Sequence, residues 1–272
     1  MRLATVRMRG SSGSETVAAM HSEEGWRRLR SPDLSALLAG QGTPQVDGEV
    51  LPDAEPVLPL PRPGKVICCG LNYADHIAET GRDNPAYPTL FAKYADTLVG
   101  PTDDVVVPRG LQVDWEAELA VVVGDVLRRA DRRAAENAIA GYTVANDISI
   151  RDWQYRTAQW FQGKAWDRTT PIGPVLVTPD ELDPEAGLDI SCRVNGHVMQ
   201  GASTKTLVFD SADLLAYVST FTTLRPGDIV LTGTPGGVGV ARDPQVFLAD
   251  GDVLETEIAG IGRLRNTIRF TD

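Results

Sequence analysis

The chain of 272 residues has few cysteines and few histidines. Its three cysteines, Cys68, Cys69 and Cys192, are too few for a disulfide framework, and this favours a reducing cytoplasm. Its three histidines are too scattered for a recognisable zinc motif. The sequence also lacks an apolar signal core at its start and any hydrophobic run of transmembrane length. We therefore expect a cytoplasmic protein without zinc, disulfides or a membrane anchor.

Positive charge is also scarce. Lysine and arginine together number 26 against 37 acidic residues, so the formal net charge is −11. This balance argues against nucleic acid or an anionic membrane as a partner. It does not exclude a small anionic substrate, because a metal ion and a few basic groups can invert the local field. The hydrophobic fraction of 42% is typical of a globular protein.

The length fits one large domain with a smaller appendage. Residues 1–60 are predicted to form a small β-rich N-terminal domain, which ends in a stiff proline-rich connector at 51–64. Its single predicted helix spans residues 34–38 and is ended by Gly40. Nothing in this part indicates chemistry, so a packing or dimer-forming role is favoured. Residues 61–272 are predicted to form the second, larger domain.

The rest of the chain alternates short strands with a few helices. A helix is expected over residues 131–140, ended by Gly141, and another over 211–221, with one apolar face each. Asn195-Gly196 is a strong signal for a two-residue hairpin. Strands are expected at residues 65–70, 90–94, 105–107, 119–123, 142–145, 175–177, 188–194, 198–200 and 229–231, with two more in the tail.

Three acids stand at the ends of two apolar strands. Glu116 and Glu118 are two residues apart, so in a strand they share a face, and Asp147 follows the run at 142–145. Adjacent, partly buried carboxylates repel one another, and three of them together suggest a hard divalent cation. The alternative is an ordinary solvated strand face with an acidic cap, because acids at strand ends are common on surfaces.

Upstream of these acids, His76 and Glu79 are three residues apart, and on a helix they would share a face. Such a pair can orient and activate a water molecule, although incidental pairs of this kind are frequent on exposed helices. Lys93 alternates with apolar neighbours in a strand, so it could face either an anion or solvent, and solvent is the default expectation.

Downstream, Arg151 and Gln154 share a face if their segment is helical. A guanidinium near metal-bound carboxylates is a natural anchor for a substrate carboxylate. The loop at 232–239, which contains Gly233 and Thr234, can present backbone N–H groups to an anion. It lacks the lysine of a phosphate-binding loop, so a carboxylate cradle is favoured over a phosphate site, and a plain turn is the alternative.

These separate signals form a recognisable pattern. Over roughly residues 60–272 the chain resembles the fumarylacetoacetate hydrolase family, in particular its shorter, acylpyruvase-like members. The resemblance depends on the ordered motifs GLNYADHIAE, FAKY, DWEAELAVV, GYTVANDISIRDWQ, GKAWDRTTPIGP and LTGTPGGVG.

The resemblance implies a mixed α/β, mainly β fold with a rolled β-sheet core, peripheral helices and a homodimeric assembly. It implies Mg²⁺ or Mn²⁺ bound by Glu116, Glu118 and Asp147. It further implies two groups of functional residues, a catalytic group of His76, Glu79 and Lys164, and a substrate-binding group of Arg151, Gln154, Thr234, Gly233 and Lys93.

The leading hypothesis is metal-dependent hydrolysis of a C–C bond in an acylpyruvate or fumarylpyruvate, in aromatic catabolism. A metal-stabilised enolate would form, Lys164 would stabilise the oxyanion, and water activated by His76 and Glu79 would attack the distal carbonyl to release pyruvate. One alternative uses the same enolate for oxaloacetate decarboxylation or for isomerisation of a 2-hydroxy-dienedioate. A non-enzymatic alternative is a structural Ca²⁺ site in an interaction protein.

Overall fold

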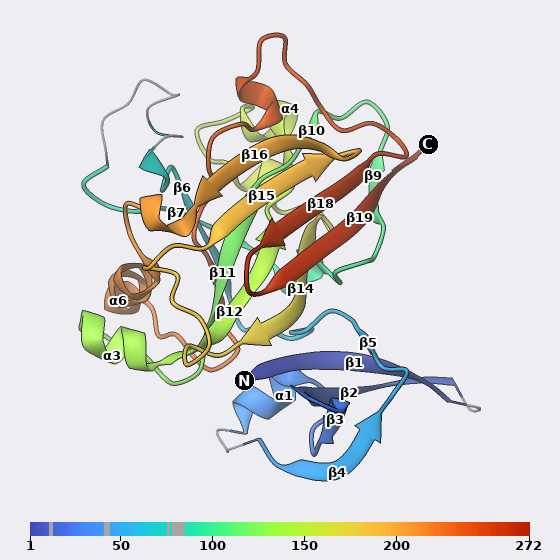
Figure 1. Cartoon of the computed structure of the whole chain (residues 1–272). Helices are drawn as coiled ribbons and strands as arrows, with labels where there is room; N and C mark the ends of the chain where they lie inside the picture. The colour runs from blue at the N-terminus through green and yellow to red at the C-terminus, as the bar shows by residue number, and fades with distance from the viewer. Residues whose placement is uncertain (11–12, 41–43, 75–76, 78–84) are drawn as a thin grey trace.

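The computed structural model describes the whole chain except residues 11–12, 41–43, 75–76 and 78–84 (Figure 1). In the described residues the fold is mixed α/β and mainly β, which confirms the predicted class. The elements follow in the order β1 (Arg2–Gly10), β2 (Gly13–Ser22), β3 (Gly25–Leu29), α1 (Leu34–Ala39), β4 (Val46–Leu51), β5 (Glu55–Pro56), β6 (Val66–Gly70), β7 (Thr89–Lys93), η1 (Ala95–Thr97), β8 (Leu98–Val99), β9 (Val105–Pro108), β10 (Val113–Asp114), β11 (Ala117–Val123), α3 (Arg132–Asn137), β12 (Ile139–Asn146), β13 (Ser149–Ile150), α4 (Arg151–Gln154), α5 (Phe161–Lys164), β14 (Thr170–Val177), β15 (Asp189–Val194), β16 (His197–Ser203), η2 (Thr204–Thr206), α6 (Ser211–Phe221), β17 (Ile229–Leu231), η3 (Gly239–Ala241), β18 (Val253–Ile258) and β19 (Gly262–Thr271).

Two larger sheets dominate the part of the chain that the structure describes. The main sheet has twelve strands, in the order β4-β3-β2-β1-β14-β12-β11-β17-β6-β7, with β5 beside β1 and β8 beside β14. The second sheet has the order β16-β15-β18-β19-β9, and β10 pairs with β13. The N-terminal strands form a separate lobe in Figure 1 but continue the main sheet, because Arg2 of β1 lies opposite Val177 of β14. The domain boundary near residue 60 stays a prediction.

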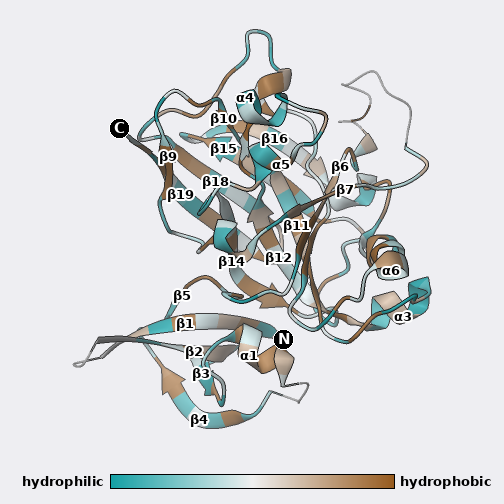
Figure 2. Ribbon diagram, turned by 180° about the vertical axis from the view of Figure 1, so that it is seen from behind, coloured by the Kyte–Doolittle hydropathy of each residue, from teal (hydrophilic) through white to brown (hydrophobic). Residues whose placement is uncertain are grey.

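The core lies between the sheets and on the far side of the main sheet. Strand β11 is buried along its whole length. Leu119 and Val121 pack into the cluster that includes Ile190 of the second sheet, whereas Ala120 and Val122 pack into a second cluster on the opposite face. A strand that is covered on both faces needs apolar residues at every position, which explains the unbroken run LAVVV. Figure 2 shows such hydrophobic stretches along the strands of the main sheet.

Several predicted elements are confirmed. Helix α6 spans Ser211–Phe221, Asn195-Gly196 joins β15 to β16, and Gly40 caps α1. The helix predicted over residues 131–140 was too long, because α3 ends at Asn137 and Gly141 lies inside β12. A side chain at Gly141 would place its Cβ 2.6 Å from the carbonyl oxygen of Val177. The glycine therefore permits a close strand approach and does not end a helix.

The strand directions bring four chain segments together at one end of the strands of the main sheet. Because β11 and β12 are antiparallel, Ala117 at the start of β11 lies opposite Asn146 at the end of β12. Strand β17 is antiparallel to β11 and parallel to β6, with Leu231 opposite both Ala120 and Cys68. The start of β11 and the ends of β12, β17 and β6 therefore meet, and the residues that follow them form the candidate site.

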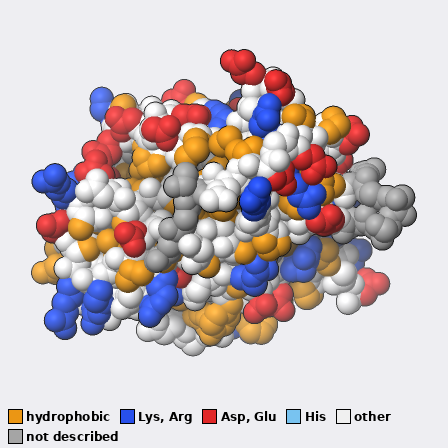
Figure 3. All heavy atoms as spheres, turned by 90° about the horizontal axis from the view of Figure 1, so that it is seen from below, with side chains coloured by type: hydrophobic (Ala, Val, Ile, Leu, Met, Phe, Trp, Pro, Cys, Tyr) orange, Lys and Arg blue, Asp and Glu red, His pale blue; other side chains and the backbone are white. Residues whose placement is uncertain are grey.

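The face of the molecule in Figure 3 carries acidic and basic side chains interspersed with apolar ones. Among the described residues, no helix is both long enough and apolar enough to cross a membrane.

Candidate metal centre and active-site cleft

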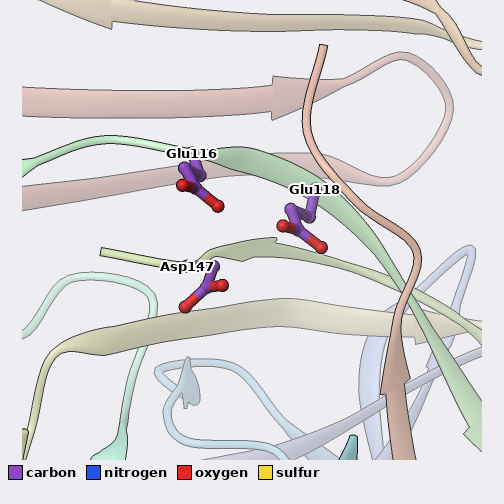
Figure 4. A group of neighbouring side chains, drawn as sticks. All are labelled: Glu116, Glu118 and Asp147. Atoms are coloured by element: carbon purple, nitrogen blue, oxygen red, sulfur yellow. The ribbon is translucent and has the colours of Figure 1, made fainter. Parts of the chain in front are cut away.

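Three carboxylates meet where β11 begins and β12 ends. One ligand oxygen from each of Glu116, Glu118 and Asp147 lies within 4.8 Å of the other two. Figure 4 shows the three side chains pointing toward one another: Glu118 lies in β11, Glu116 directly precedes it, and Asp147 comes from the neighbouring chain segment. The backbone supports this placement, because the N–H of Asp147 donates to the carbonyl of Glu116 at 2.8 Å. The predicted cluster of three acids is therefore formed.

The cluster is buried, and burial makes its negative charge costly. Glu118 is 1% exposed. Its pKa lies well above the ordinary value, first because burial disfavours the charged form and then because Asp147 and Glu116 repel its charge. The backbone N–H of Gly233 donates to Glu118 Oε2 at 2.7 Å and opposes this shift in part. The carboxylates therefore need compensating positive charge.

Two buried lysines supply part of that charge. Lys164, at the end of α5, donates to Glu116 Oε2 at 2.7 Å and to Asp147 Oδ2 at 2.8 Å. Burial lowers the pKa of Lys164, but the charges of Asp147 and Glu116 raise it further, and the net shift is upward. Lys93 forms an ion pair with the other oxygen of Asp147. The expectation that Lys93 faces solvent was wrong, because its side chain is buried and its ammonium group contacts Asp147 and the carbonyl oxygen of Ile148.

Arg151 extends the charged cluster toward the cleft. It begins the short helix α4, and its Nη1 contacts Glu116 Oε1 at 2.8 Å and donates to Gln154 Oε1 at 2.8 Å. The predicted shared helical face of Arg151 and Gln154 is thus confirmed. Burial lowers the pKa of Arg151, whereas the charges of Glu116 and Asp114 raise it above its ordinary value. The guanidinium is therefore charged and fixed in place.

The glycine-containing loop after β17 closes the site from the other side. Its Gly233 N–H was predicted to face a substrate anion, but it donates to Glu118 and so orients a carboxylate of the cluster. Thr234 is buried, and its hydroxyl oxygen accepts a hydrogen bond from Gln200 at 2.8 Å. Of the two residues, Thr234 is the one that reaches the cleft.

A cleft of about 500 Å³ opens beside the carboxylates. Its polar lining includes Glu116, Arg151, Gln154, Lys164 and Thr234, and its apolar lining includes Leu71, Phe91, Trp160, Val238 and Val240. Trp160 packs edge-on against Phe91, with ring centroids 5.8 Å apart. The cleft therefore has a charged end for an anion and an aromatic wall for a less polar group.

The structure brings nine of the predicted site residues together. His76 and Glu79 lie outside the described residues, so their proposed water-activating role stays a prediction. The nine are Glu116, Glu118, Asp147, Lys93, Lys164, Arg151, Gln154, Gly233 and Thr234.

Among the buried residues that support the site, Asp114 and Gln200 were not predicted from the sequence. Asp114 accepts from Arg151 Nε at 2.7 Å and from the backbone N–H groups of Gly239 and Val240 at 2.7 and 3.0 Å. The alternation of Asp114 with Glu116 and Glu118 in the sequence is a signal that could have found it. Gln200 contacts the start of β11 and the glycine-containing loop. No local sequence pattern predicts these contacts.

The donor set fits a hard divalent cation. The described residues of the site hold four buried carboxylates and three buried cations, namely Asp114, Glu116, Glu118 and Asp147 against Lys93, Lys164 and Arg151. The site therefore keeps excess negative charge, and the three clustered carboxylates offer only oxygen ligands, which Mg²⁺, Mn²⁺ and Ca²⁺ prefer. The acidic cluster can hold a divalent metal ion.

Comparisons with known proteins identify the family of the chain. Residues 65–269 match the model of the family described as fumarylacetoacetate (FAA) hydrolase C-terminal. The human mitochondrial oxaloacetate tautomerase FAHD2A is 47% identical over 224 residues, which cover 80% of this chain and 71% of the relative.

Solved structures extend the similarity to the whole chain. A fumarylacetoacetate hydrolase from the psychrophile Exiguobacterium antarcticum is 33% identical, has a TM-score of 0.88, and is matched over 99% of this chain and 100% of its own. A 5-carboxymethyl-2-hydroxymuconate delta-isomerase from Mycobacterium smegmatis is also 33% identical, with a TM-score of 0.82 and full coverage of both chains. Matched by the family model over most of its length, the chain is an enzyme that belongs to the fumarylacetoacetate hydrolase family.

Proposed function

We propose that the protein catalyses metal-dependent keto–enol interconversion of oxaloacetate or of a similar 2-keto acid. The observation that carries the proposal is the bridge formed by Lys164 between Glu116 and Asp147, at 2.7 and 2.8 Å, on the border of the cleft. This bridge concentrates positive charge beside a cluster of carboxylates that can hold a divalent cation, and an enolising substrate develops negative charge on its keto oxygen.

Mg²⁺ or Mn²⁺ is the proposed cofactor, and when bound it would supply Lewis-acid polarisation of the substrate carbonyl. Lys164 contributes a fixed positive charge toward the same oxygen. Arg151 and Gln154, held together by their 2.8 Å hydrogen bond, present a planar guanidinium and an amide to a substrate carboxylate. Among the described residues of the site, four carboxylates face three cationic side chains, so the net charge is −1. A bound divalent ion would change this net charge to +1, which suits an anionic ligand.

The reaction is balanced without a further reactant. One proton leaves the carbon beside the ketone, one proton arrives on the former keto oxygen, and no carbon–carbon bond breaks. The name of the 47% identical human relative, an oxaloacetate tautomerase, supports this reaction over our leading sequence-based hypothesis of acylpyruvate hydrolysis.

Hydrolysis of a C–C bond in an acylpyruvate or fumarylpyruvate is the second candidate. The spacing of His76 and Glu79 favours it, because such a pair can activate water, and so does the similarity to a fumarylacetoacetate hydrolase. A purely structural Ca²⁺ site is disfavoured, since it would need neither the buried lysines nor the cleft.

A substrate panel distinguishes these reactions. We expect Mg²⁺ or Mn²⁺ to accelerate the decay of enol absorbance of oxaloacetate, EDTA to abolish this effect, and either ion to restore it. Release of pyruvate from acetylpyruvate would instead identify the hydrolase, and release of CO₂ from oxaloacetate the decarboxylase. No metal-dependent change in any of these keto acids would overturn the proposal.

The variants His76→Ala and Glu79→Gln separate the two candidates further. Hydrolysis should collapse in both variants, because the water-activating pair is lost, whereas tautomerisation should persist. We also propose a homodimeric assembly, which the molar mass from light scattering tests directly.

A further inference from the structure

Gln200 connects the second sheet to the start of β11 in the main sheet, beside the candidate metal site. It lies in β16, and its side chain is almost completely buried. Its Oε1 accepts a hydrogen bond from the N–H of Ala117 at 2.9 Å. Its Nε2 donates to Thr234 Oγ1 and to the carbonyl oxygen of Pro235, both at 2.8 Å. Gln200 therefore contacts the backbone between Glu116 and Glu118 and also the loop that lines the cleft.

The two backbone partners determine which way the amide of Gln200 points. Ala117 offers only an N–H donor there, and Pro235 offers only a carbonyl acceptor. A flipped amide would set two donors against each other at Ala117 and two acceptors against each other at Pro235. The orientation with Nε2 toward the loop is thus the one that satisfies all three contacts, and its second hydrogen must go to Thr234.

This orientation decides how Thr234 can bind a ligand. A hydroxyl group has one hydrogen to donate, and its oxygen accepts from Gln200. In the described part of the chain, the structure shows no acceptor for the hydroxyl hydrogen of Thr234. The side chain lines the cleft together with Arg151 and Lys164, so the hydrogen is available to an oxygen atom of a ligand.

We propose that Gln200 is a positioning residue that makes Thr234 a hydrogen-bond donor to the carboxylate of the substrate. This inference rests on the proposed function, because it takes the ligand to be an anionic keto acid. Gln200 never touches the substrate itself. It acts by donating to the oxygen of Thr234, so that the hydroxyl hydrogen must point elsewhere, and by holding the loop against the backbone of β11.

The first test removes the hydroxyl group. Thr234→Val should raise KM for oxaloacetate by roughly tenfold or more, because a hydrogen bond to a charged group is lost. We expect kcat to change by much less, and Thr234→Ser, which keeps the hydroxyl, to recover most of the KM increase seen in Thr234→Val. An unchanged KM in Thr234→Val would overturn the proposal, even if no Gln200 variant folds.

The second test asks whether Gln200 acts through Thr234. Gln200→Met removes the donor, and the Thr234 hydroxyl can then turn its hydrogen toward the unpaired carbonyl of Pro235. We expect KM to rise as in Thr234→Val, and the double variant to be no worse than the more impaired single variant. Additive effects on KM, or a loss of Mg²⁺ affinity measured by calorimetry, would show a merely structural role. Gln45→Met, at an exposed position in the N-terminal lobe, is the matched control and should leave KM unchanged.

A binding measurement separates this inference from the proposed function. The probe is oxalate, a planar dianion that carries the same carboxylate, titrated into Mg²⁺-loaded protein. If the wild type binds oxalate without converting any keto acid, the proposed function fails, and the dissociation constants of the variants still test Thr234. If oxaloacetate is converted but all variants match the wild type, the role of Gln200 fails alone.

Discussion

The carboxylate of Asp114 accepts a hydrogen bond from Arg151 Nε at 2.7 Å, and both side chains are buried. The same carboxylate oxygen also accepts from the N–H of Val240, so it faces two donors. Asp114 thereby fixes the guanidinium that contacts Glu116 and also the turn that forms one wall of the cleft.

Asp114→Asn should strongly destabilise the protein. The amide would place its own N–H₂ group against donors, and Arg151 would lose a buried counter-charge, so we expect the free energy of unfolding to fall by about 3–5 kcal/mol. Urea denaturation measures this change. The control is Asp104→Asn, which removes a surface ion pair with Arg269 and should cost less than about 1 kcal/mol. Equal effects of the two substitutions would contradict this assignment.

Relative to the wild type, Glu118→Gln should be more stable without metal and less stable with it. In EDTA, it removes one of three repelling carboxylates, and it keeps an oxygen for the N–H of Gly233, so the free energy of unfolding should rise by about 1 kcal/mol or more. Because the pKa of Glu118 is raised in the folded state, the wild type loses stability as pH rises above the ordinary value of 4.5, and the advantage of the variant should grow in the same range.

With Mg²⁺ at a hundredfold excess over its dissociation constant, the wild type should gain about 2.7 kcal/mol, whereas Glu118→Gln should gain little. Denaturation with EDTA and with Mg²⁺ measures both effects. Equal stabilisation of the two proteins by Mg²⁺ would exclude Glu118 as a ligand.

Cys192→Ala should reduce the slope with which the free energy of unfolding falls as pH rises above 9. Burial raises the pKa of this thiol above its ordinary value of 9.0. Above pH 9 the unfolded chain therefore releases a proton that the folded chain retains, and the free energy of unfolding falls by up to about 1.4 kcal/mol per pH unit for each such thiol. The variant lacks one such contribution. Denaturation curves between pH 7 and 10.5 test this, and parallel slopes above pH 9 in both proteins would disprove it.

Gly70→Ala should disturb the aromatic wall of the cleft. A Cβ atom at this position would lie 2.5 Å from Cζ3 of Trp160, so the indole must move relative to Phe91. We expect a stability loss of about 1–3 kcal/mol from overpacking and a change in KM. Gly201→Ala is the matched control, since a Cβ there meets nothing within 4 Å. Wild-type KM and melting temperature in Gly70→Ala would refute the prediction.

The sequence by itself determined the local elements and the three acids of the candidate metal site. The unbroken apolar run of β11, the one-sided pattern of α6 and the turn at Asn195-Gly196 depend on neighbouring residues, so local periodicity and turn preferences reveal them. Glu116, Glu118 and Asp147 could be predicted because each stands at the end of a recognisable apolar strand.

Only the tertiary structure decided which residues complete the site. The pattern of its own strand predicts that Lys93 is exposed. It is buried because the fold places it against Asp147, 54 residues away, whose negative charge offsets the cost of burying the ammonium group. The helix was expected to run to residue 140, but the chain enters strand β12 at Ile139. Pairing with β11 and close contact with β14 outweigh the local helix preference there.

Gln200 shows the same limit most clearly. Its partner Ala117 lies 83 residues away and Thr234 lies 34 residues away, so no window of sequence contains the contact. Buried polar groups must find hydrogen-bond partners wherever the fold places them. The strand pattern predicts where carboxylates gather, whereas the packing of the two sheets selects the side chains that orient and neutralise them.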